Sequence, residues 1–60
     1  MKDNVIVQNI KSSIVFLRKH STFSADIAEG QLKLLLETNA TDQELRDFGK
    51  DLDAANDVWR

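Results

Sequence analysis

The first residue that could do chemistry is His20, the one histidine of the chain, which stands between Lys19 and Ser21. A serine and a histidine suggest a nucleophile and its base, but such groups must point at each other, which adjacent residues rarely do. A histidine that follows two cations is typical of the last turn of a helix, where the dipole favours positive charge. We therefore expect His20 to end a helix.

A second set of residues resembles fragments of a calcium-binding loop: Asp51, Asp53, Asn56 and Asp57. The glycine and the glutamate that such a loop needs at its sixth and twelfth positions are missing. Gly30 and Gly49 stand alone, without a phosphate-binding loop or a dinucleotide fingerprint around them. The chain has no cysteine, which excludes disulfides, thiol nucleophiles and cysteine zinc sites. We expect no catalytic residue, no cofactor and no metal, and hence a protein that is not an enzyme.

Helical spacing of apolar residues predicts a first helix over about residues 4–19. Its main face consists of Ile6, Ile10, Ile14 and Leu17. Asp3 is a plausible N-cap for this helix. The β-branched residues 5–7 leave a short strand open as the alternative. The pattern runs on past strand length, which favours the helix.

A second helix is expected over about residues 24–38, with Ser24 as its N-cap and Phe23 packed against Ala28. It carries one apolar strip formed by Phe23, Ile27, Gly30 and Leu34, and another formed by Ala28, Leu32 and Leu35. A helix this apolar needs cover on more than one side. Gly30 either lets a neighbouring helix approach closely or breaks this helix in two.

Asn39 and Ala40 form a natural stop, since Asn tolerates the left-handed conformation at a helix end. Thr41 and Glu44 then have the spacing of a capping box, which begins a third helix over about residues 42–58. Its apolar seam is formed by Leu45, Phe48, Leu52, Ala55 and Trp59. The sequence thus predicts one all-α domain over residues 1–60, a small three-helix bundle.

The size of the chain predicts self-association. A core built from 60 residues seldom supplies more than about 3–5 kcal/mol. With no disulfide or visible metal site, a homodimer is the natural source of further stability, although all the apolar surface could also fit inside one bundle. The longest apolar run is residues 14–17, far short of the roughly 20 residues of a spanning helix. We expect no membrane segment and a cytoplasmic location.

The absence of catalytic and metal motifs favours a regulatory or accessory protein that binds and modulates another protein. Phe16 and Leu36 lie off the main apolar stripes and are candidate partner-binding residues. Trp59 is a third candidate, because tryptophan is enriched among binding hot spots. The alternative for Trp59 is a core position that closes the bundle beneath Phe48 and Leu52.

Nucleic acid offers two alternative functions. The second and third helices could form a helix-turn-helix in a dimeric DNA-binding regulator, but the third helix is acidic and would repel phosphates. A nucleic-acid surface would then fall on the basic residues of the first segment, which are Lys2, Lys11, Arg18 and Lys19. Conversely, the third helix could imitate nucleic acid through Asp47, Asp51 and Asp53, although these carboxylates lie on several sides of it.

Overall fold

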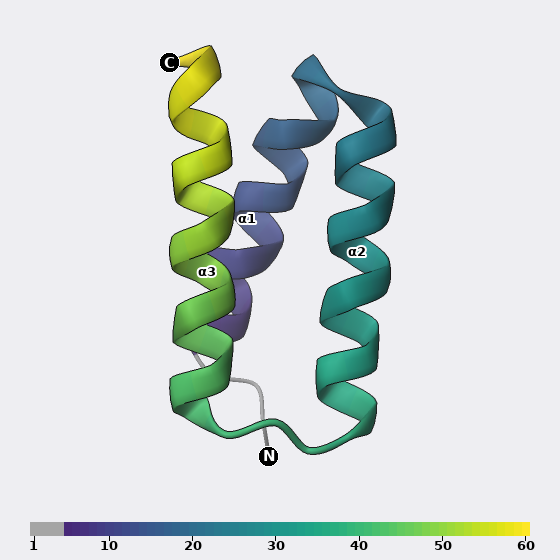
Figure 1. Cartoon of the computed structure of the whole chain (residues 1–60), viewed down its shortest axis with the longest axis vertical. Coiled ribbons are helices and arrows are strands. Elements are labelled where there is room, and N and C mark those ends of the chain that lie inside the picture. Colours follow the sequence, from purple (N-terminus) through teal and green to yellow (C-terminus); the bar gives the residue numbers. More distant parts are fainter. Residues whose placement is uncertain (1–4) are drawn as a thin grey trace.

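A computed structural model describes residues 5–60, which form three α-helices and one final 3₁₀ turn (Figure 1). The elements are α1 (Val5–His20), α2 (Thr22–Glu37), α3 (Asp42–Asn56) and η1 (Asp57–Trp59). The predicted all-α three-helix bundle is confirmed, and residues 5–7 belong to a helix. Asp3, the expected N-cap of α1, lies outside the described residues.

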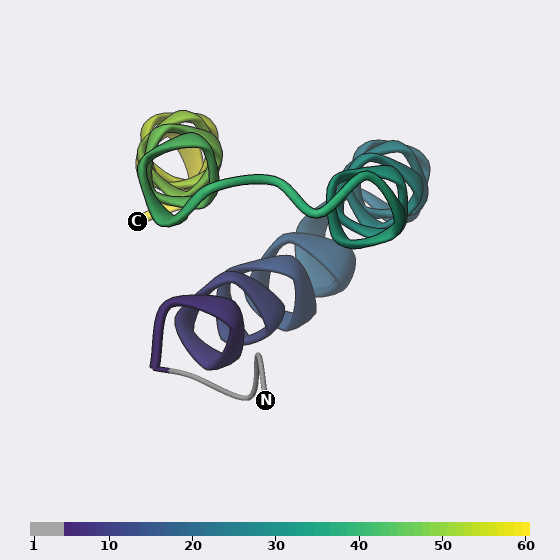
Figure 2. The same cartoon turned by 90° about the horizontal axis from the view of Figure 1, so that it is seen from below.

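The first helix holds the bundle together. α2 and α3 run antiparallel, and α1 packs against both of them along the gap that separates them (Figures 1 and 2). α2 and α3 make few contacts with each other. Because α1 faces two partners, it contributes the largest share of the buried apolar residues.

The core lies where α1 meets the other two helices. Its buried apolar residues are Val7, Ile10, Ile14 and Leu17 from α1, Ala25, Ala28 and Leu32 from α2, Ala40, and Leu45 and Leu52 from α3. Three of the four residues expected on the main face of the first helix are buried, while Ile6 is half-buried at its edge. Helical periodicity therefore located the core correctly.

The connection between α1 and α2 differs from expectation. Ser21 is the N-cap of α2, and its Oγ accepts a hydrogen bond from the Ser24 backbone N–H at 3.3 Å. The prediction that Ser24 caps the helix is therefore wrong, and α2 begins two residues earlier. Phe23 lies in the first turn with 76% of its surface exposed, so it is not packed on Ala28 as expected. A single residue thus joins α1 to α2.

The connection between α2 and α3 follows the sequence signals. Asn39 takes the left-handed conformation at φ 56°, and the Ala40 N–H reaches back to the Leu35 carbonyl at 2.9 Å. Thr41 and Glu44 form the predicted capping box, with side-chain to backbone bonds in both directions. Backbone groups that would be unpaired at the end of α2 and at the start of α3 thereby gain hydrogen-bond partners.

Gly30 lies inside a continuous α2, so the break that the sequence left open as an alternative does not occur. A Cβ added at Gly30 would meet no atom within 4 Å. Gly30 therefore does not serve a close approach between helices of this chain. No described helix combines the length and the apolar character needed to cross a membrane.

Candidate protein-binding face between α1 and α3

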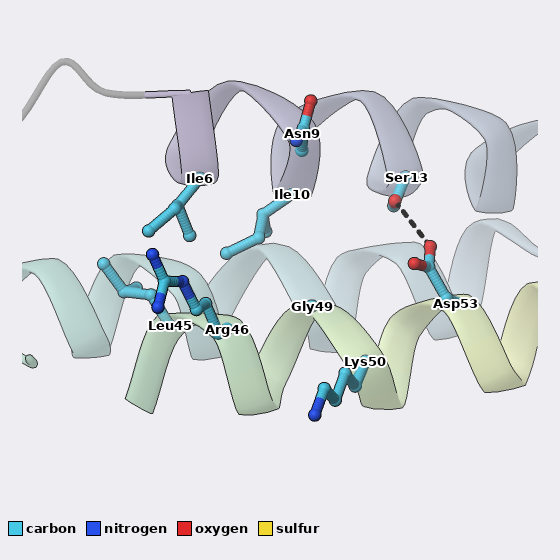
Figure 3. A pocket seen from close by; sticks show the side chains of 9 residues that line it. All are labelled: Ile6, Asn9, Ile10, Ser13, Leu45, Arg46, Gly49, Lys50 and Asp53. Atoms are coloured by element: carbon cyan, nitrogen blue, oxygen red, sulfur yellow. Dashed lines mark hydrogen bonds between the residues drawn. The ribbon is translucent and has the colours of Figure 1, made fainter. Parts of the chain in front are cut away.

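A groove of about 290 Å³ runs between α1 and α3 (Figure 3). Residues Ile6, Asn9, Ile10 and Ser13 line it from α1, and Leu45, Arg46, Gly49, Lys50 and Asp53 line it from α3. Ile10 and Leu45 are buried and form an apolar floor. Gly49 leaves room above that floor, since its missing Cβ would lie 3.5 Å from Ile10 Cγ1. The groove can therefore accept an apolar side chain.

Polar and charged groups form the rim of the groove. At one end, Ser13 Oγ donates a hydrogen bond to Asp53 Oδ1 at 3.2 Å and so joins the two helices. Arg46 and Lys50 are exposed, and within residues 5–60 neither forms an ion pair. In Figure 3 the Arg46 side chain extends toward Ile6, whereas Lys50 turns away from the groove. Arg46 is therefore an uncompensated cation at the rim, and Lys50 is a second one beside the groove that points away from it.

An aromatic cluster lies where the end of α1 meets η1. The His20 ring is stacked on Trp59, with centroids 5.3 Å apart and an interplanar angle of 7°. The Phe16 ring also contacts His20, with ring centroids 4.8 Å apart in a tilted geometry. The Arg60 guanidinium lies 5.6 Å from the Phe16 centroid, within the range of a cation–π contact. Phe16 and Trp59, both predicted to bind a partner, are thus brought together by His20.

Asp53 connects the aromatic cluster to the groove. The carboxylate that accepts from Ser13 also lies 3.9 Å from Arg60, which in turn pairs with Asp57 at 3.0 Å. Arg60 therefore contacts the cluster on one side and the polar end of the groove on the other. We refer to the groove together with Phe16, His20, Trp59 and Arg60 as the α1–α3 face.

Trp59 and Leu36, two of the predicted partner-binding residues, are both exposed. Trp59 is 45% exposed, which argues against the alternative in which it closes the core. Leu36 is 38% exposed on α2 and does not line the groove or join the aromatic cluster. The three candidate residues therefore do not form one site.

The basic residues proposed for nucleic acid are dispersed. Lys2 lies outside the described residues, and Lys19 is exposed near the end of α1. Arg18 forms salt bridges to Asp26 at 2.8 Å and Glu29 at 2.7 Å. Its hydrogen bond to Asp26 is the largest cause that raises the pKa of the Arg18 guanidinium. With Arg18 neutralised by α2, little of the basic surface is left on α1 beyond Lys11 and Lys19.

The arrangement of the helices supports neither the hypothesis of an acidic nucleic-acid mimic nor that of a helix-turn-helix. Asp53 faces α1, while Asp51 lines a different pocket between α2 and α3, so the carboxylates do not form one strip. α2 and α3 run antiparallel, whereas the helices of a helix-turn-helix cross at about 90–120° (Figure 1).

Ser21 and His20 do not pair with each other, because Ser21 Oγ is hydrogen-bonded to Ser24 and the His20 ring packs on Phe16 and Trp59. Within residues 5–60, no group of three or more metal-ligating side chains could hold an ion. Asn56, considered above as a calcium-loop fragment, is fully buried in the bundle.

One of the two apolar strips expected on the second helix is exposed. Phe23, Ile27 and Leu34 lie on one side of α2 and are 76%, 58% and 54% exposed. The sequence signal was present, since α2 has two apolar strips and a single neighbouring helix can bury only one. We call these three residues, together with Gly30 between them, the α2 seam.

Comparisons of the chain with protein-family models, with curated proteins and with solved structures found no match.

Proposed function

We propose that this chain is a small, non-catalytic regulatory or accessory module that acts in the cytoplasm and binds another protein through the α1–α3 face. One observation carries the proposal: Trp59 is held in a stack on His20 and yet keeps 45% of its surface exposed. An ordered aromatic ring at a surface is the kind of group that dominates binding hot spots, because it offers large contact area with little entropy to lose.

The groove supports this proposal by giving the partner a second contact. Ile10 and Leu45 form an apolar floor, and Gly49 leaves room above it. A partner side chain placed there would add a second apolar contact, separate from the one at the aromatic cluster.

The charges of the rim favour a partner of particular chemistry. Arg46 and Lys50 lack partners within residues 5–60, whereas Asp53 is already held by Ser13 and Arg60. We therefore expect a protein segment that carries apolar side chains for the groove and carboxylates for these two cations. Such charge pairs act mainly on specificity and on the rate of encounter.

The role of Trp59 can be tested without unfolding the protein. Leu45 and Leu52 provide the buried apolar contacts of α3, and Trp59 lies beyond the end of that helix. Trp59→Ala should therefore retain the helical circular dichroism signal while weakening partner binding. Val15→Ala is the matched control, because Val15 is an exposed apolar residue of α1 that lines neither the groove nor the aromatic cluster.

The experiment is a tagged pull-down from cell extract, divided into nuclease-treated and untreated halves and analysed by mass spectrometry. We expect the same protein to be captured by the wild type and Val15→Ala in both halves, and to be lost with Trp59→Ala and with the Arg46→Glu, Lys50→Glu double variant. Capture that survives Trp59→Ala would contradict the proposed face. Capture that disappears with nuclease would instead favour a nucleic-acid function.

A further inference from the structure

The α2 seam is an apolar surface that the chain leaves uncovered. Phe23 and Leu34 lie on the side of α2 away from its buried residues, and Ile27 lies at the edge of that side, where it also lines the pocket toward α3. Successive positions in the seam, Gly30 included, are separated by four, three and four residues. That spacing is the one with which a helix presents a continuous stripe to another helix.

The seam is self-complementary when a second α2 runs in the opposite direction. In that register Phe23 faces Leu34 of the second copy, and Ile27 faces Gly30 of the second copy. The same four positions serve both helices, as a two-fold symmetric interface requires. In a parallel pair Gly30 would face Gly30 and leave a void at the centre.

The contacts within one chain do not explain why a glycine occupies position 30. Glycine weakens a helix interior relative to alanine. No atom lies within 4 Å of the position its Cβ would occupy, so packing within the chain does not require a glycine there. Opposite Ile27 of a second copy, the missing side chain provides the hole into which the isoleucine fits.

The charges beside the seam agree with the antiparallel direction. Asp26 and Lys33 each precede a seam residue and therefore lie on the same flank of α2. In the antiparallel register Asp26 comes beside Lys33 of the second copy, offset by about 3 Å along the helix axis. Lys33 forms no ion pair in the described part of the chain, and Asp26 pairs with Arg18 through only one of its carboxylate oxygens.

We propose that a second copy of this chain docks on the α2 seam, with the two α2 helices antiparallel and Ile27 of each copy packed over Gly30 of the other. This interface uses α2 alone and leaves the α1–α3 face of each copy open. A standard interface buries about 800 Å² on each partner. The chain exposes 4278 Å² in total, and a seam of four positions provides only part of such an area, so we expect the dimer to dissociate on dilution.

The test is analytical ultracentrifugation of the full chain from micromolar to near-millimolar concentration. The wild type should shift from one 6.8 kDa species toward twice that mass. Gly30→Gln fills the hole with a good helix former and should give a monomer whose helix content is undiminished. Ile27→Ser should raise the self-association Kd by about tenfold or more, whereas Val15→Ser, which removes a β-branched side chain of the same exposed fraction from α1, should leave it unchanged.

The charge pair gives a second test that depends on the antiparallel direction. Asp26→Lys alone places two cations together, and Lys33→Glu alone places two anions together, so each variant should be monomeric. Mixing the two variants restores opposite charges at both sites, and the mixture should form a heterodimer. A wild type that remains a monomer at every concentration, equal effects of Ile27→Ser and Val15→Ser, or a mixture without a heterodimer would overturn the proposal.

Discussion

The side-chain amide of Asn56 donates a hydrogen bond to the backbone carbonyl of Ser13 at 3.1 Å, across 43 positions of sequence. Asn56 is fully buried, and among the described residues its Oδ1 has no hydrogen-bond partner. This bond ties the end of α3 to the middle of α1. A buried polar contact of this kind holds two helices in one register, because any slip would leave the amide unpaired.

Replacing Asn56 with alanine should destabilise the fold. Asn56→Ala removes the bond to Ser13 and leaves a small cavity, and together these effects should lower the free energy of unfolding by about 1–3 kcal/mol. Urea denaturation followed by circular dichroism measures the change. Asn9→Ala is the control, because Asn9 is exposed on the same side of α1. Equal stability of the two variants would show that the contact contributes nothing.

Replacing Asn56 with aspartic acid should make stability depend on pH. Burial beside the Ser13 carbonyl would raise the pKa of the introduced carboxyl above its unfolded value of about 3.9. The protonated acid can still donate to Ser13, but the carboxylate cannot. A group whose folded pKa is raised loses its stabilising effect as pH rises through that pKa. The difference in unfolding free energy between Asn56→Asp and the wild type should therefore be small near about pH 3 and large near about pH 7. A difference that does not change with pH would contradict this account.

Gly49→Ala should stabilise the protein. Gly49 lies inside α3, and an added Cβ would meet Ile10 Cγ1 at 3.5 Å, an ordinary van der Waals distance. Alanine is favoured over glycine in a helix interior by about 1 kcal/mol, so the free energy of unfolding should rise by about that amount. Thermal denaturation provides the measurement. A lower melting temperature would mean that α1 and α3 pack too closely for a methyl group.

Local signals accounted for most of the fold. The periodic apolar residues located all three helices, and the capping box at Thr41 and Glu44 formed as predicted. Ser21 and Ser24 were harder to separate, since either hydroxyl can cap a helix. The choice depends on where α1 ends, because the Ser21 N–H still bonds to the Leu17 carbonyl at 2.7 Å. A pattern confined to one helix does not contain that information.

Non-local contacts account for what the sequence did not predict about the candidate site. Asparagine is a residue type that usually lies at the surface. The burial of Asn56 depends on its hydrogen bond to Ser13 in another helix. The buried part of the apolar seam predicted for the third helix ends at Leu52, because Ala55 is exposed within α3. Beyond Asn56, α3 gives way to η1, whose tighter winding changes the direction in which side chains project. His20 was correctly placed at the end of a helix, but its contacts with Phe16 and Trp59 arise only when α1 and η1 pack together.

The salt bridges of Arg18 make a final prediction. Arg18 reaches from α1 to Asp26 and Glu29 on α2, and its pKa is raised chiefly by the hydrogen bond to Asp26. The guanidinium therefore stays charged at any working pH, and salt concentration is the variable that weakens the contact. Arg18→Gln should lower the melting temperature at low salt, and the deficit should shrink at about 1 M salt, where the Debye length is only about 3 Å. Lys19→Gln, a neighbouring exposed cation without an ion pair in the described residues, should have little effect in either condition. A deficit for Arg18→Gln that persists at high salt would show that the arginine stem acts through packing and that its charge contributes little.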